Sequence, residues 1–80
     1  MGSRKTKDLV KLIERRAGDF NSSIEAQQLI EQGADITATT KNGSMIDSVI
    51  AEENRLQKVT PERAQCCQRL VKILIDHASR

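Results

Sequence analysis

The segment LIEQGADITATTKNG, Leu29–Gly43, decides how this 80-residue chain is expected to fold. It begins as the end of an amphipathic run and reaches Gly33, a residue type that adopts the left-handed conformation after a helix without steric cost. Apolar and polar residues then alternate, and Asn42–Gly43 is a strong signal for a tight turn. The segment therefore predicts a helix that stops at Gly33 and is followed by an extended finger.

Two helices are expected before this finger, because apolar residues recur there at helical spacing. The first spans about residues 5–17. The second begins at Ser22, which together with Glu25 matches a capping box, in which the serine side chain caps the helix and the glutamate reaches back. The residues expected to face inward on the second helix are Ala26, Leu29 and Ile30.

Two further helices are expected after the finger. The third spans about residues 44–56, with Ser44 as its cap. The fourth begins at Thr60–Pro61, where proline loses nothing because its missing N–H would have no partner in the first turn. The inward residues of the third are Ile46, Val49, Ile50 and Leu56. The stripe of the fourth, which runs to about residue 78, is Cys67, Leu70, Val71, Leu74 and Ala78, widened by Cys66, Ile73 and Ile75.

The composition indicates one small globular domain covering residues 1–80. Apolar residues make up 38% and charged residues 30% of the chain, a balance that favours a folded core over disorder. Phe20 is the single aromatic residue, so the core is expected to be aliphatic. Residues 1–6 are expected to be a flexible tail or a tag remnant. No apolar run approaches the ~18 residues of a transmembrane helix, so no membrane partner is expected.

The charge pattern argues against nucleic acid as a partner. The formal net charge is only +2, although basic residues are concentrated near the start of the chain. Stacking aromatic residues for single strands are lacking. Binding to nucleic acid through the basic start therefore ranks last among the functions considered, and it would reveal itself by weakening steeply with salt.

Cys66, Cys67 and His77 are the residues that invite a catalytic or metal-binding interpretation. All three belong to one expected helix, on which His77 would lie about 15 Å along the axis from Cys67. They cannot meet, and no second Cys/His pair completes a zinc site. We expect no enzymatic activity, no metal and no cofactor. Cys67 is expected in the core with Cys66 more exposed, and two thiols in an otherwise unstapled chain favour a reducing, cytoplasmic location.

The finger and its flanks closely resemble the join between two ankyrin repeats. Leu29–Ile30, Gly33–Ala34–Asp35–Ile36 and Asn42–Gly43 match the family pattern of a helix end, a turn and a hairpin tip. The stretch 70–79, LVKILIDHAS, resembles the second helix of a repeat, and residues 13–35 resemble an opening repeat more weakly. The resemblance implies an all-α fold: a short ankyrin-like stack of about four helices, in two pairs, joined by a β-hairpin-like finger.

The chain departs from the family pattern in two places. The helix opening Thr-Pro-Leu-His-x-Ala is replaced by Ser44–Val49, and Val49 and Ile50 stand where small residues let helices approach closely. The distance in sequence from Gly33 to its counterpart, Ala78, also exceeds the family period of about 33 residues. The second repeat is therefore expected to have an enlarged helix–helix connection around Arg55–Arg63.

The resemblance implies a non-catalytic protein–protein interaction module that binds a partner protein through the finger tip and a concave helix surface. The residues at those positions are Thr39, Thr40, Lys41, Asn42, Ser48, Glu52 and Arg55. The alternative is a structural role, as a capping or stacking segment of a longer ankyrin array or as a self-associating subunit. Two repeats are fewer than the about three that such stacks usually need, which keeps this alternative open.

Overall fold

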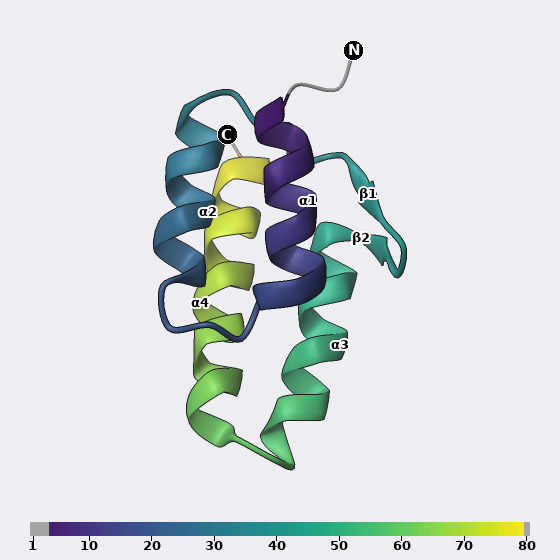
Figure 1. Ribbon diagram of the computed structural model, residues 1–80, viewed down its shortest axis with the longest axis vertical. Helices are drawn as coiled ribbons and strands as arrows, with labels where there is room; N and C mark the ends of the chain where they lie inside the picture. Colours follow the sequence, from purple (N-terminus) through teal and green to yellow (C-terminus); the bar gives the residue numbers. More distant parts are fainter. Residues whose placement is uncertain (1–3, 80) are drawn as a thin grey trace.

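The computed structural model describes residues 4–79 and shows four helices and a small antiparallel hairpin in that range (Figure 1). The elements, in order, are α1 (Arg4–Arg16), α2 (Ser22–Glu31), β1 (Thr39–Thr40), β2 (Gly43–Ser44), α3 (Met45–Gln57) and α4 (Pro61–Ala78). The expectation of a mostly helical fold with four helices is confirmed. The expected tail at residues 1–6 overlaps α1, because residues 4–6 are helical; residues 1–3 lie outside the described range.

The helices pack as two antiparallel pairs. α1 lies against α2, and α3 lies against α4; contacts between α2 and α4 and between α1 and α3 join the pairs (Figure 1). The hairpin projects to one side, where β1 contacts both α1 and α3. This arrangement puts α1, α3 and the hairpin on one side of the molecule and α2 and α4 on the other.

The core between these layers is aliphatic, as the composition requires. Its largest fully buried side chains come from α1, α3 and α4: Leu9, Leu12, Ile13, Met45, Val49, Cys67, Leu70 and Leu74. α2 contributes chiefly Ala26, with Leu29 and Ile30 partly buried against the core. Phe20, the single aromatic residue, lies outside the core and is 66% exposed. The absence of aromatic rings thus leaves small and branched side chains to fill the space.

Two of the inward positions expected from periodicity, Ile50 and Ala78, are wrong. Ile50 is 39% exposed, because the buried side of α3 is centred on Met45, Val49 and Leu56. Ile50 follows Val49 and is therefore rotated by about 100° from that centre. Ala78, in the last turn of α4, is exposed. The spacing of apolar residues shows which of them can share one side of a helix. Packing against the neighbouring helices determines which side is buried.

Gly33 ends the second helical unit as predicted. Its φ is +102°, its N–H donates to the carbonyl of Ile30 at 3.0 Å, and the N–H of Ala34 donates to the carbonyl of Leu29 at 3.0 Å. This pair of bonds is the Schellman motif, which satisfies carbonyls at the helix end and requires a left-handed residue at the position of Gly33. The chain then turns sharply at Asp35, whose carboxylate accepts hydrogen bonds from the backbone and hydroxyl of Thr37.

The finger is less extended than expected. Only Thr39 and Thr40 pair with Ser44 and Gly43, so each strand has two residues. The tip is Lys41–Asn42, one position earlier than the predicted turn, and Gly43 has φ +105° within β2. Asn42 has no positive φ. Both types of primed two-residue turn require positive φ at the first central residue, so Asn42–Gly43 does not form the centre of one.

Of the three side chains expected to cap helices, Ser44 does so, whereas Ser22 and Thr60 do not. Ser44 Oγ accepts the N–H of Asp47 at 3.1 Å and caps α3 as predicted. Ser22 lies inside α2, where its buried hydroxyl donates to the carbonyl of Ala17 at 2.9 Å; the capping box is therefore wrong. Thr60 stands at the N-cap position of α4, but its side chain makes no capping bond.

These differences give a direct test of the caps. Ser44→Ala should lower the free energy of unfolding by about 1 kcal/mol, because the Asp47 N–H loses its acceptor. Thr60→Ala should change it by less than about 0.5 kcal/mol, since no capping bond is lost. Urea denaturation of both variants measures the difference, and equal effects would contradict the cap assignment.

Candidate binding surface

The hairpin tip is an exposed loop whose backbone is held from within. Thr40 Oγ1 donates to the carbonyl of Gly43 at 3.0 Å and accepts the N–H of Asn42 at 3.1 Å. Thr40 is therefore buried, whereas Thr39, Lys41 and Asn42 are exposed. The Thr40 hydroxyl stabilises the loop conformation, and the side chains of Thr39, Lys41 and Asn42 face solvent.

A second contact ties the tip to α1. The N–H of Lys41 donates to Glu14 Oε2 at 2.8 Å, which joins residues 27 positions apart in the chain. The bond uses the Lys41 backbone and therefore leaves the lysine side chain exposed. Glu14 was not predicted from the sequence, because nothing in the local pattern indicates which carboxylate of a helix will meet a distant loop.

On α3 the predicted residues divide by burial. Ser48 is only 3% exposed and lies in the core, so a partner cannot reach it in this conformation. Glu52 and Arg55 form a two-bond ion pair, with Nε–Oε1 and Nη2–Oε2 distances of 2.8 Å each. The hydrogen bonds from Arg55 lower the pKa of Glu52 below its ordinary value. Because the Arg55 side chain is largely exposed, this pair contributes little to stability.

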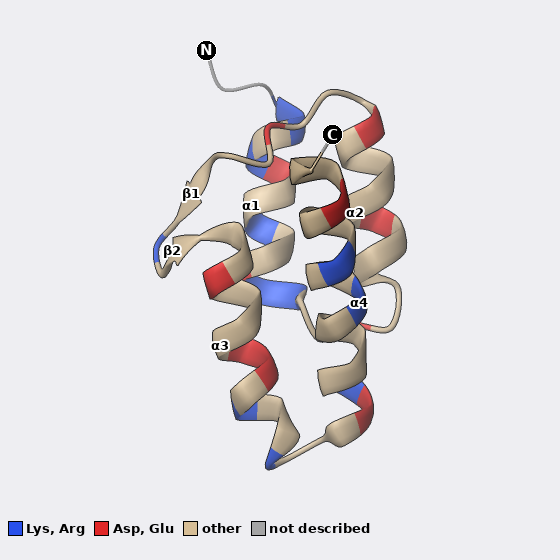
Figure 2. Ribbon diagram, turned by 180° about the vertical axis from the view of Figure 1, so that it is seen from behind, with Lys and Arg blue, Asp and Glu red and all other residues tan. Residues whose placement is uncertain are grey.

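The predicted surface thus contains two groups: the exposed Thr39, Lys41 and Asn42 at the tip, and the exposed Arg55 with the partly buried Glu52 on α3. The tip connects to α3 through Ser44, and Glu52 lies about 12 Å further along the helix axis. Figure 2 shows acidic segments along α3 and basic segments along α1, with the hairpin beside them. In the free chain, Thr40 makes hydrogen bonds within the loop and Ser48 is buried in the core.

The cysteines are both free and both buried. Cys66 was expected to be more exposed than Cys67, but the difference is only 3% against 0%, and the Cys66 Sγ lies 3.6 Å from the carbonyl of Glu62. His77 instead forms a hydrogen bond with Gln27 of α2 at 3.2 Å. Burial, and to a lesser degree the carboxylates of Glu52 and Glu53, raises the pKa of Cys67 to about 11.

Cys67 should therefore react slowly with iodoacetamide in the folded protein at neutral pH. The thiolate is the nucleophile, and both burial and the raised pKa disfavour it. Mass spectrometry of native protein against urea-unfolded protein measures the rates. Rapid labelling of Cys67 in the native state would contradict the burial and reopen a catalytic interpretation.

The same shift sets a pH dependence of stability. The pKa of Cys67 rises from an ordinary 9.0 to about 11 on folding, so the folded state keeps its proton at a pH where the unfolded state loses it. The stabilising contribution is complete below pH 9.0 and is lost as pH rises towards about 11. Denaturation across this window should show a steeper decline for the parent protein than for Cys67→Ala.

Within residues 4–79 no group of three or more His, Cys, Asp and Glu side chains is placed to hold a metal ion. Nor does any helix there combine the length and apolar character that a membrane span requires.

Comparisons with protein-family models, with curated proteins and with solved structures gave no match to this chain.

Proposed function

We propose that this chain is a non-catalytic protein-binding module whose contact surface is the hairpin tip together with the exposed part of α3. The observation that carries the proposal is the tip itself. Its backbone is held by Thr40 from within and by Glu14 from α1, while Lys41 and Asn42 remain exposed. A loop that is ordered before binding loses little conformational entropy when a partner docks.

The order of elements supports an ankyrin-like interpretation of this surface. A helix pair, a short hairpin and a second helix pair follow one another, and the resemblance at Leu29–Gly43 implies that finger tips and first helices form the binding face in that family. The accessible residues here include an exposed lysine at the tip and, on α3, the exposed Arg55 paired with the partly buried Glu52. A set of side chains with both positive and negative charges is suited to contact with the surface of a partner protein. Two free thiols support a reducing intracellular compartment as part of this proposal.

A structural role is the second candidate, and exposed apolar residues favour it. Ile50 on α3 and Ile75 on α4 are 39% and 49% exposed, and Ile46 and Val71 are partly buried one turn away from them on the same helices. Apolar surface of this kind often marks a contact with another protein. A neighbouring repeat or a second copy of the chain would cover it. Sedimentation velocity across concentration tests self-association directly.

The binding proposal is tested by a matched pair of charge reversals. Lys41→Glu alters the tip, whereas Lys58→Glu makes the same charge change at the exposed C-cap of α3. In pull-downs from native cytosol, we expect proteins captured by the parent chain to be lost with Lys41→Glu and kept with Lys58→Glu. Glu52→Lys should reduce capture as well. Identical capture by the parent and Lys41→Glu proteins would refute the tip as the contact surface.

A further inference from the structure

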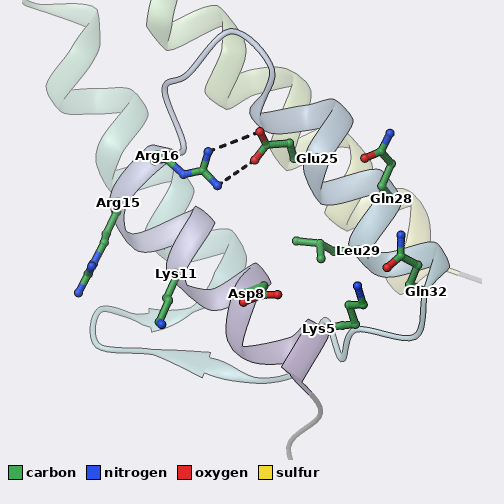
Figure 3. Close-up of a pocket in the computed structure, with 9 residues that line it drawn as sticks. All are labelled: Lys5, Asp8, Lys11, Arg15, Arg16, Glu25, Gln28, Leu29 and Gln32. Carbon is green, nitrogen blue, oxygen red and sulfur yellow. Dashed lines mark hydrogen bonds and ion pairs between the residues drawn. The ribbon is translucent and has the colours of Figure 1, made fainter.

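A groove of about 650 Å³ lies between α1 and α2, on the side of α1 away from the hairpin contact (Figure 3). Lys5, Asp8, Lys11 and Arg15 contribute to its α1 side. In Figure 3 the Leu29 side chain extends from α2 into the space between the helices, whereas the Lys11 and Arg15 side chains extend from the outer side of α1, away from α2. Leu29 is the only apolar residue in the lining.

One end of the groove is closed by an ion pair. Arg16 Nη2 and Glu25 Oε2 are 2.9 Å apart, and a second contact of 3.4 Å joins the same side chains. Arg16 is the only basic residue of the lining that forms an ion pair within the described part of the chain. Lys5, Lys11 and Arg15 form none there. The open part of the groove therefore has three unpaired cations and one carboxylate, that of Asp8.

The helix that supplies these cations has an excess of positive charge. α1 contains six basic and two acidic residues, a larger surplus than the +2 of the whole chain. Its first turn has no acidic residue and includes Arg4, Lys5 and Lys7. Cations at this end oppose the helix dipole, which favours negative charge there. An acidic ligand along α1 would relieve both the mutual repulsion and this unfavourable placement.

We propose that the groove binds an acidic protein segment that inserts one leucine-sized side chain against Leu29 and places carboxylates beside Lys5, Lys11 and Arg15. A phosphate polymer fits less well, because Asp8 and Glu25 also line the groove and an apolar side chain occupies its floor. This surface goes beyond the one proposed at the hairpin tip. The two lie on different sides of α1, since Glu14 contacts the hairpin and is not part of the groove.

The probe for this site is a fluorescein-labelled 13-residue peptide, the length of α1, in which Asp and Glu surround one central Leu. Fluorescence anisotropy measures its dissociation constant. Lys11→Glu/Arg15→Glu should weaken binding about tenfold or more, because two attractions become repulsions. Arg69→Glu/Lys72→Glu, on an exposed part of α4, makes the same change in net charge and should leave the affinity close to that of the parent.

Further variants of the peptide and of the protein test the apolar contact and the charge contacts separately. Replacing the peptide's leucine with serine should weaken binding severalfold, and Leu29→Ala should remove most of that difference. Lys41→Glu should not change the peptide affinity, so failure of the hairpin proposal and failure of this one are separately visible. Thermal melting verifies that each variant is folded. The milder pair Lys11→Gln/Arg15→Gln, expected to bind with intermediate affinity, keeps the test decisive if the double reversal does not fold.

Three results would overturn the proposal. The peptide does not bind, or the two double reversals weaken it equally, which would assign the effect to net charge alone. In the third, duplex RNA or vesicles of anionic phospholipid bind more tightly than the peptide and depend on Lys11 and Arg15. That result would assign the groove to phosphate-bearing ligands instead.

Discussion

Leu70→Ala should lower the free energy of unfolding by about 2–5 kcal/mol, because it removes a fully buried side chain and leaves a cavity. Leu70 lies in the middle of α4, the helix that packs against both α2 and α3. A domain of this size is stable by only about 0.05–0.15 kcal/mol per residue. Over 80 residues this amounts to about 4–12 kcal/mol, so the variant should lose a large fraction of its stability.

Ile75 on the same helix is the matched control for this substitution. It is 49% exposed, and Ile75→Ala should cost about 1 kcal/mol or less. Urea denaturation followed by far-ultraviolet circular dichroism measures both changes. Leu29→Ala should fall between them, because Leu29 is only partly buried. If Leu70→Ala and Ile75→Ala shifted the midpoint equally, the face of α4 would be wrongly assigned.

Gly33→Val should lower the free energy of unfolding by about 1–2 kcal/mol, since a β-branched residue is strained at positive φ. The effect comes from the backbone alone: φ is +102°, and a Cβ atom at this position would have no neighbour within 4 Å. The Schellman bonds of Gly33 and Ala34 depend on this conformation. Their weakening would loosen the end of α2 and the turn that leads into the hairpin.

Gln32 provides the control for this effect. It is exposed, precedes Gly33 and has φ −87°, so Gln32→Val adds the same side chain at a position without left-handed strain. We expect it to cost clearly less than Gly33→Val in the same thermal and urea experiments. Similar costs at the two positions would mean that β-branching, rather than positive φ, explains the loss.

Most of the helical architecture was predictable because its signals are local. Gly33 stops a helix through its own backbone freedom, Pro61 begins one because it needs no N–H partner, and Ser44 reaches an N–H only three residues away. Each of these causes lies within a few residues of its effect. The central stripe of α4 was predictable for the same reason, since Cys67, Leu70 and Leu74 recur at the period of the helix itself.

The candidate surface could be predicted only in part. Lys41 and Asn42 are exposed at the tip because a hairpin loop has solvent on its outer side. Thr40 and Ser48 are equally polar in the sequence, yet both are buried: Thr40 makes the loop's internal hydrogen bonds, and Ser48 faces the core from α3. Polarity alone does not indicate whether a side chain meets solvent or a partner within the fold.

The sequence by itself determined the number, order and approximate limits of the helices, the aliphatic character of the core and the position of the hairpin. Only the tertiary structure decided that Ser22 donates to Ala17, that Cys66 is buried, and that Glu14 holds the backbone of Lys41. The physical reason is distance along the chain. Helix propensity and capping act between near neighbours, whereas burial and hydrogen bonding between α1 and the hairpin depend on how the two helix pairs pack.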